Sequence, residues 1–306
     1  MTWLILAFTS AALLGCYDSF KKEALKDNAV IPVLFLNTLF SSLIFLPFIL
    51  LSEGSNALDG TAVHVASGGW NEHKYILLKS VIVLSSWVLG YFGMKHLPLT
   101  IVGPINATRP VMVLVGALLV FGERLNLWQW AGVLLAVISF FMLSHSGKRE
   151  GIDFRRDHWI WMIVGAAALG AVSGLYDKYI MAPVESGGAG LDRMMVQSWY
   201  TIYQCIMMFA MLVLLWWPYR HHTTPFHWHW SIIGVSVFLS VADFAYFYSL
   251  SMPDAMISIV SMIRRGSVVV SFLFGAVFFH ERNLKAKAAD LALVLLGMLC
   301  LYIGSR

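Results

Sequence analysis

Three arginines lie deep inside long apolar runs of this chain. Arg109 stands in LTIVGPINATRPVMVLVGALLV, and Arg264 and Arg265 stand in MISIVSMIRRGSVVVSFLFGAV. An arginine at the centre of a bilayer costs about 2.5–3.5 kcal/mol on insertion scales, so it needs a partner or a water-filled cavity. The guanidinium group stays charged, and its donors match carboxylate or phosphate oxygens. We therefore predict an anion-binding site; the alternative is structural pairing inside a helix bundle.

The surroundings of these arginines are repeated within the chain. Residues 91–124 and 246–282 share a Tyr-Phe pair, a proline, an arginine and a closing Glu-Arg, with three extra residues in the second copy. Arg109 aligns with Arg264, and each follows its proline by 11 residues, about 16 Å along a helix. A repeat of this length indicates two copies of one multi-helix unit.

The composition indicates that the lipid bilayer surrounds most of the chain. Of its 306 residues, 59% are hydrophobic and only 12% are charged, which exceeds what a soluble domain of this size needs. The net charge of +4 comes from short loops and not from a basic stripe with exposed aromatics, so no nucleic-acid partner is expected. The three cysteines and the histidines of residues 221–229 match no standard metal spacing, so we predict no metal and no cofactor.

A membrane-spanning helix needs about 20 apolar residues, and ten segments of the chain qualify. They are residues 3–20, 31–51, 75–95, 99–121, 127–144, 159–181, 194–217, 229–251, 254–279 and 285–303. Because five helices per copy is an odd number, the two copies must cross the membrane in opposite directions. We therefore predict an all-α polytopic membrane protein whose ten transmembrane helices form two inverted five-helix repeats. The units are residues 1–147, a linker at 148–158, and residues 159–306.

This arrangement is typical of secondary transporters, in which the substrate binds near the midplane between the two halves. Two polar residues share a helix face with the arginines. Asn106 lies three residues before Arg109, and Ser261 lies three residues before Arg264, a spacing that keeps each pair on one side of a helix. Both are candidates to bind substrate; the alternative is a local hydrogen bond within the bundle.

Matching tyrosines and one unmatched carboxylate complete the candidate binding groups. Tyr91 and Tyr246 occupy equivalent positions near the ends of the third and eighth predicted helices. Each is a candidate donor to a substrate oxygen, and the alternative is an interfacial aromatic belt. Asp243 lies in the apolar run SVFLSVADFAYFYSL, where the first copy has a valine. The simplest interpretation is charge balance with Arg264 or Arg265, and the sharper one is a proton-coupling carboxylate.

Two further carboxylates recur near the ends of the first and sixth predicted helices. Asp18 precedes Lys21 and Lys22, which we expect in a water-facing turn, and Asp177 is adjacent to Lys178. We predict interfacial ion pairs at both places, with a cation gate as the alternative.

Two pairs of small residues are spaced four apart on the same two predicted helices. They are Ala11 with Gly15, and Gly170 with Gly174. This spacing lets helices approach closely, so we expect tight helix packing at these positions.

Charged residues also mark the connections between the predicted helices. Glu123 and Glu281 end the fourth and ninth helices at tight turns, where a carboxylate can cap the next helix. We therefore predict a structural or gating role for them. Lysine and arginine concentrate in the odd-numbered loops, which by the positive-inside rule puts those loops in the cytoplasm and both termini outside.

The run ATRPVMVLVGALLVFGERLNLWQWAGVLLAVISFFML, residues 107–143, resembles the fourth and fifth helices of the EamA family of the drug/metabolite transporter superfamily. The matching features are Pro110, the Gly122-Glu123 step and Gly132. Gly15 followed by Lys21 or Lys22 resembles the family's signature in helix 1. The second copy matches less well, because a histidine stands in place of Gly122 and an aspartate in place of Gly132.

The resemblance implies a ten-helix carrier that works by alternating access, with both termini in the cytoplasm, opposite to the orientation that the loop charges indicate. Members of the superfamily move amino acids, drugs, nucleotide sugars or phosphorylated sugars. In the organic-phosphate branch, basic residues on helices 4 and 9 and a tyrosine on helix 8 hold phosphate. Arg109, Arg264-Arg265 and Tyr246 stand at the corresponding places in this chain.

Together these features predict a secondary transporter of a small anionic metabolite that functions as a monomer in a bacterial inner membrane. The alternative is an exporter of amino acids or of cationic, drug-like compounds that uses Asp243, or Asp18 with Asp177. A membrane enzyme or receptor without transport is the remote alternative, because the apolar segments contain no nucleophile–base set and no metal-ligand set.

Overall fold

A computed structural model describes most of the chain. The described residues are 2–109, 111–112, 126–148, 156–181, 184–250, 263–264, 266–278 and 284–304. Within these ranges the regular structure is entirely helical, and no residue lies in a strand. The all-α prediction is therefore confirmed for the described part of the protein.

The helices follow the apolar segments of the sequence closely. Their bounds are α1 Thr2–Leu25, α2 Val30–Gly54, α3 Trp70–His96, α4 Leu99–Ala107, α6 Leu127–Lys148, α7 His158–Met181, α8 Arg193–Met211, α9 Ser231–Leu250, α11 Ser267–Val277 and α12 Leu284–Gly304, with a π-helical continuation of α8 at Leu212–Trp216. Every one of the ten predicted segments overlaps one of these helices. Short 3₁₀ turns at Asn56–Leu58 and Val184–Ser186 lie in the loops that follow α2 and α7.

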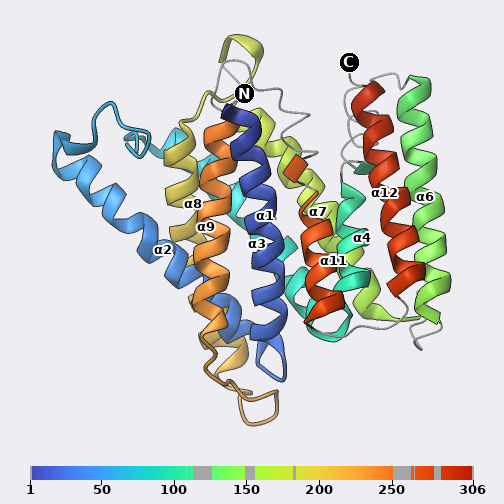
Figure 1. Ribbon diagram of the computed structural model, residues 1–306. Coiled ribbons are helices and arrows are strands. Elements are labelled where there is room, and N and C mark those ends of the chain that lie inside the picture. The colour runs from blue at the N-terminus through green and yellow to red at the C-terminus, as the bar shows by residue number, and fades with distance from the viewer. Residues whose placement is uncertain are drawn as a thin grey trace.

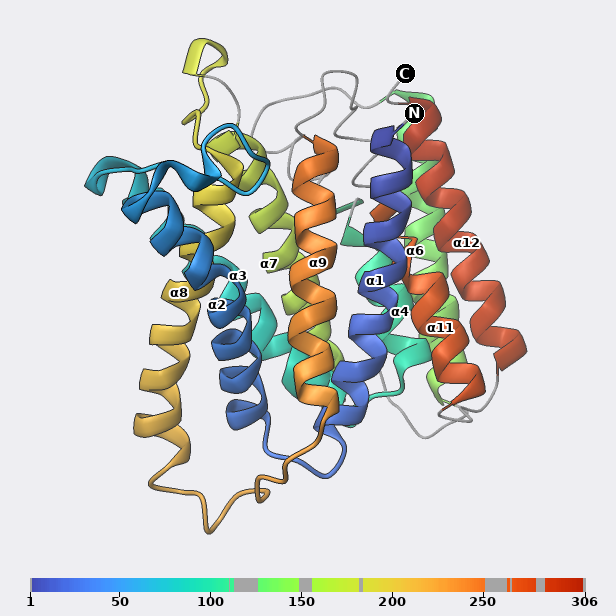
Figure 2. The same ribbon diagram turned by 60° about the vertical axis from the view of Figure 1, so that its left-hand side comes forward.

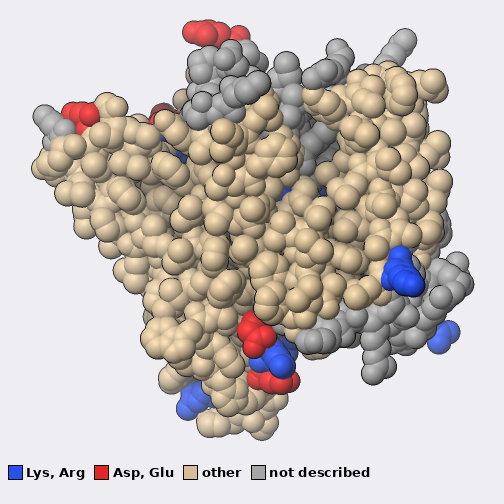
Figure 3. Space-filling view, viewed as in Figure 1, with Lys and Arg blue, Asp and Glu red and all other residues tan. Residues whose placement is uncertain are grey.

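Within the described residues, six helices are long and apolar enough to cross a membrane, namely α1, α2, α3, α7, α8 and α9. Shorter apolar stretches occur within α6, α11 and α12. In the space-filling view, uncharged side chains form a broad band across the middle of the face, and the visible charges lie toward its two ends (Figure 3). A lipid-facing surface should look like this, so the protein is a multi-pass integral membrane protein.

The helices run between two ends of a bundle, and the N- and C-termini lie at the same end (Figures 1 and 2). The closest packing partners come from opposite halves of the sequence. They are α1 with α9, α3 with α7, α2 with α8, α6 with α12, and α4 with α11. Neither half could form its present core alone, because each helix buries its inner face against a helix of the other half.

Side chains close the ends of several helices. The Oε2 atom of Glu72 accepts the backbone N–H of Gly69 at 2.8 Å at the start of α3. The Oδ1 atom of Asp192 accepts the N–H of Met195 at 2.9 Å at the start of α8. Both contacts satisfy donors that the first turn of a helix leaves unpaired.

The first helix extends further than the sequence indicated, and its two lysines lie inside the structure. α1 continues to Leu25, so Lys21 and Lys22 do not form a water-facing turn, and Lys21 is only 7% exposed. Lys22 donates from Nζ to the carbonyl oxygens of Met94 and Leu97, at 2.7 and 2.6 Å, and so caps the end of α3. The prediction was wrong because a long apolar stem lets the ammonium reach a partner away from bulk water. These two lysines are therefore not loop charges that orient the protein.

Glycine sets the distance between α1 and α11. A Cβ atom on Gly15 would lie 2.3 Å from the Cβ of Val270 and 3.0 Å from the carbonyl oxygen of Ser267. This contact agrees with the close helix packing expected at Gly15. Gly174, the counterpart of Gly15 on α7, has no described heavy atom within 4 Å of such a Cβ, so the described part of the structure does not show the close packing expected at this position.

We predict that Gly15→Ala destabilises the protein by about 1–3 kcal/mol, because the methyl group would force α1 and α11 apart. Thermal unfolding in detergent would show this as a lower melting temperature. Gly174→Ala is the matched control, and it should leave the melting temperature unchanged or raise it slightly, because alanine favours the helix more than glycine does. Equal melting temperatures for the two variants would contradict the prediction.

Candidate functional site

A cavity of about 200 Å³ lies at the centre of the bundle, between α1, α3, α4, α7, α8, α9 and the start of α11. Its wall carries charged residues from both halves of the chain. These are the cations Lys21, Lys79, Arg109 and Arg264 and the carboxylates Asp18, Asp177 and Asp243. Charges of this number inside an apolar bundle are costly unless they are paired or solvated, so how they pair decides what the cavity can bind.

The pair expected for Asp243 is present. The guanidinium of Arg264 forms an ion pair with the Oδ1 atom of Asp243, and the hydroxyl of Tyr200 donates to Oδ2 at 3.0 Å. Arg264 also lies over the ring of Tyr246, with Cζ 4.1 Å from the ring centroid, in cation–π geometry. Arg264 is therefore held by two residues of α9, a carboxylate and an aromatic ring.

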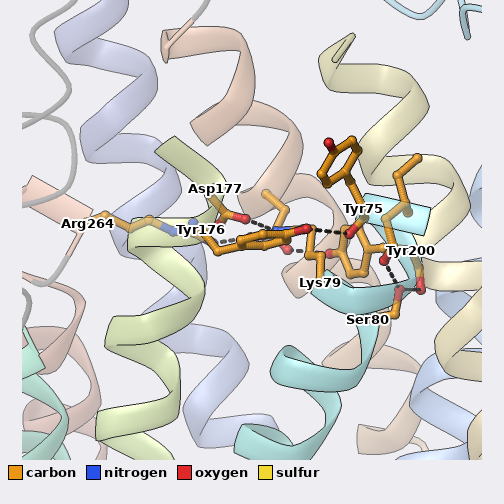
Figure 4. Close-up of polar contacts among 9 residues, drawn as sticks. Tyr75, Lys79, Ser80, Tyr176, Asp177, Tyr200 and Arg264 are labelled. Atoms are coloured by element: carbon orange, nitrogen blue, oxygen red, sulfur yellow. Dashed lines mark hydrogen bonds and ion pairs between the residues drawn. The ribbon is translucent and has the colours of Figure 1, made fainter. Parts of the chain in front are cut away.

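A second ion pair joins the two halves of the chain. Lys79 on α3 contacts the Oδ1 atom of Asp177 on α7, and the two side chains point toward each other in Figure 4. Beside this pair, the hydroxyl of Tyr176 donates to the carbonyl oxygen of Tyr75 at 3.2 Å (Figure 4). An ion pair of Asp177 is therefore present as expected, with Lys79 on the facing helix as a partner. The side chain of Lys178, the partner expected from the sequence, lies outside the described part of the structure.

Asp18 is paired as expected, although inside the protein and not at its interface. The Nζ atom of Lys21 lies 2.9 Å from the Oδ1 atom of Asp18, one helical turn away on α1. The hydroxyl of Ser271 on α11 donates to Oδ2 at 3.2 Å. The ammonium of Lys21 also lies 4.3 Å from the ring centroid of Tyr17. The pair therefore lines the central cavity rather than the membrane surface.

Arg109 differs from the other three cations of the cavity. Its Nη2 atom donates to the Oδ1 atom of Asn106 at 3.1 Å, as the shared helix face predicted. Its Nε atom is buried without a hydrogen-bond partner. Asp18 attracts the guanidinium and Arg264 repels it, yet no described carboxylate comes within 4 Å of it. Across the described residues, Arg109 is thus the cavity cation that has no anionic partner.

Both arginines stand beside an interruption in regular helical hydrogen bonding. The N–H of Thr108 bonds to the carbonyl of Ile105 at 3.2 Å, and the N–H of Gly266 bonds to the carbonyl of Ile263 at 2.9 Å. These are three-residue steps in place of the four-residue steps of an α-helix. Continuous helices over 99–121 and 254–279 were therefore not the correct expectation. In the first case Pro110, which has no N–H, gives a physical reason for the break.

The two candidate tyrosines line the cavity. Tyr91 is 1% exposed, and its hydroxyl accepts a hydrogen bond from the Nδ2 atom of Asn37 at 3.0 Å. Tyr246 lies beneath Arg264. Neither stands in a belt at the surface of the protein, so both remain candidates to contact a bound molecule.

Four of the candidate residues lie outside the described part of the chain, namely Ser261, Arg265, Glu123 and Glu281. Conversely, sequence reasoning overlooked several residues of the cavity, among them Lys79, Tyr17 and Tyr200. Lys79 should have been recognised, because it is a lysine within a predicted transmembrane segment, as the arginines are. Tyr17 and Tyr200 carry no such signal, because an aromatic residue within an apolar run usually only packs.

A wider and more open groove of about 550 Å³ lies at the starts of α3 and α8. Its two carboxylates, Glu72 and Asp192, cap the first turns of their own helices. Helix capping therefore accounts for the two carboxylates of the groove, and the groove is separate from the charged cavity. Among the described residues, no group of three or more histidine, cysteine, aspartate and glutamate side chains is arranged to hold a metal.

Comparisons with known proteins agree with this geometry. The family model described as the EamA-like transporter family matches residues 1–145. A search of curated proteins finds no match. Among solved structures, a crystal structure described only as that of a protein is similar to this chain, with a TM-score of 0.66 at 13% identity, over 99% of this chain and 97% of its own. That likeness extends the shared fold across both halves. The first half of the chain, residues 1–145, therefore matches the EamA-like transporter family of the drug/metabolite transporter superfamily.

Proposed function

We propose that this protein is a secondary transporter of a small anionic metabolite, which binds Arg109 in the central cavity. The observation that carries the proposal is the missing partner of Arg109. Lys21, Lys79 and Arg264 each contact a carboxylate, whereas Arg109 has only the amide of Asn106 among the described residues. An anionic substrate would supply the missing negative charge.

Charge and hydrogen bonding both favour this assignment. The described wall of the cavity carries four cations and three carboxylates, so its net charge is positive before a ligand binds. A buried cation without a counter-charge is unfavourable, and a bound carboxylate or phosphate would relieve that cost. The buried Nε donor of Arg109 also lacks an acceptor, and the oxygens of such groups accept from guanidinium donors with good geometry.

The size of the cavity limits the substrate to a small molecule. About 200 Å³ lies below the roughly 300–1,000 Å³ that is typical of pockets for drug-sized ligands. A short carboxylate or a small phosphorylated compound would fit that volume better than a nucleotide sugar. The four tyrosines of the wall, Tyr17, Tyr91, Tyr200 and Tyr246, would offer ring faces to the uncharged part of the substrate.

For the architecture we propose ten transmembrane helices in two inverted five-helix repeats that work by alternating access. The helix contacts support it: α1 packs on α9 while α7 packs on α3, which is the same contact with the halves exchanged. The helix breaks beside Arg109 and Arg264 also support it, because discontinuous helices typically form the binding sites of inverted-repeat transporters. The repeats would be residues 1–147 and 159–306, joined by 148–158, in a monomer of a bacterial inner membrane.

The alternative, an exporter of amino acids or of cationic compounds, has less support. It would rely on Asp243, or on Asp18 with Asp177, as a cation-binding or proton-coupling group. Each of these carboxylates already contacts a lysine or an arginine. A cationic substrate would have to displace that partner, whereas an anionic substrate can approach Arg109 directly.

The first prediction concerns Arg109→Gln, which we expect to weaken the binding of anions at least tenfold while the protein stays folded. The measurement is the rise in melting temperature of the detergent-purified protein with inorganic phosphate, a sugar phosphate and succinate, against tetraethylammonium and lysine. Arg220→Gln is the control, because Arg220 lies in the loop after α8, on the ring of Trp217. Shifts with cations or zwitterions alone would contradict the proposal and favour the exporter.

The second prediction concerns the Asp243–Arg264 pair. Asp243→Asn should destabilise the protein by about 3–5 kcal/mol, because it leaves a buried guanidinium without its carboxylate. The double variant Asp243→Asn with Arg264→Gln should recover much of that loss, because it removes both charges together. Thermal unfolding of the two single variants and the double variant gives the interaction energy. A double variant as unstable as the sum of its singles would show that the pair is not coupled.

A further inference from the structure

We propose that Gly170 on α7 is a positioning residue for Arg109, because the missing side chain at this position leaves the space in which the guanidinium lies. The inference rests on the proposed function insofar as Arg109 is the anion-binding group. On this view, a glycine in the second half of the chain determines where the guanidinium of Arg109, in the first half, lies.

The distances between Gly170 and the guanidinium of Arg109 support this role. A Cβ atom built on Gly170 would lie 2.7 Å from the Cζ of Arg109, 2.8 Å from Nη1 and 3.0 Å from Nε. Three atoms of one planar group at almost equal distances mean that the guanidinium faces the backbone of α7 with its flat side. No other residue type leaves this space empty, since every other one carries a Cβ atom there.

Little else holds Arg109 in place. Among the described residues, its one hydrogen bond runs from Nη2 to Asn106 at 3.1 Å, and no carboxylate anchors it. Arg264, by comparison, is held by Asp243 and by the ring of Tyr246. A long side chain with one hydrogen bond keeps most of its rotamer freedom unless packing restricts it. Contact with the bare surface at Gly170 supplies that restriction.

The consequence of adding a methyl group differs between the three glycines that can be compared. At Gly15 the methyl group would meet the Cβ of Val270 and a backbone oxygen, neither of which can move without its helix. At Gly170 it would meet the tip of a flexible arginine, which can move while the helices stay where they are. At Gly174, one turn further along α7, it would meet no described atom within 4 Å.

The contact also links the two halves of the transporter. Arg109 follows α4 in the first half, and Gly170 belongs to α7 in the second. Any movement of α7 relative to α4 would change the surface against which the guanidinium lies. The position of the anion-binding group is in this way tied to the relative position of the two halves.

The test compares Gly170→Ala with Gly174→Ala, using inorganic phosphate and succinate as probes of affinity. Gly170→Ala should weaken their binding about tenfold or more and leave the melting temperature within a few degrees of the wild type. Gly174→Ala should change neither quantity. In an Arg109→Lys background, Gly170→Ala should have no further effect, because the compact ammonium does not need a flat surface. That loss of effect is a result that a merely structural role for Gly170 would not produce.

A second readout needs no ligand. Phenylglyoxal reacts with guanidinium groups, and peptide mass spectrometry reports the extent of reaction at Arg109 separately from Arg220. Gly170→Ala should change the rate at Arg109 several-fold and leave the rate at Arg220 unchanged, and Gly174→Ala should alter neither rate.

The outcomes separate this inference from the proposed function. Equal labelling of Arg109 in Gly170→Ala and Gly174→Ala, with equal anion affinity, would overturn the positioning role. A fall in melting temperature like that of Gly15→Ala would also overturn it, because the methyl group would then displace helices and not the arginine. Should the wild type bind neither anion, or Arg109→Gln leave binding unchanged, the anion site would be wrong while the labelling would still decide whether Gly170 positions Arg109.

Discussion

The cost of holding charge in a low-dielectric interior governs how these helices are arranged around their centre. Seven charged side chains line one cavity of about 200 Å³, and each needs a partner or water to remain ionised there. In the Lys79–Asp177 pair each charge is the partner of the other, and the pair joins α3 of the first half to α7 of the second. Because breaking such a pair leaves a buried charge, the contact between α3 and α7 is stabilised by more than apolar packing.

The same pairing defines what the cavity can recognise. Three carboxylates are used by three cations, so the described wall presents its remaining cation, Arg109, to a ligand. Glycines allow close approach around the cavity: Gly170 accommodates the guanidinium of Arg109, and Gly103 on α4 packs directly against Val268 on α11. In such a site the positive charge selects an anion. The close approach of the helix backbones places that charge where the anion can reach it.

Much of this could be predicted from single residues and their spacing. Apolar segments of about 20 residues located the helices, and an arginine within such a segment pointed to a cavity. The same rule, applied to Lys79, would have placed that lysine in the site as well. Lys21 was harder, because a cluster of lysines near a helix end resembles a loop, and only the burial of α1 up to Leu25 shows otherwise.

The helical segments, their repetition and the presence of buried arginines could be predicted from the sequence, because they depend on hydropathy and spacing along one chain. That Asp177 pairs with Lys79, 98 residues away, could be learned only from the tertiary structure. The same is true of the contact between Gly170 and Arg109, and of the absence of any described atom within 4 Å of a Cβ built on Gly174. The physical reason is that ion pairing and close packing depend on distances between helices, and no local pattern in a sequence encodes those distances.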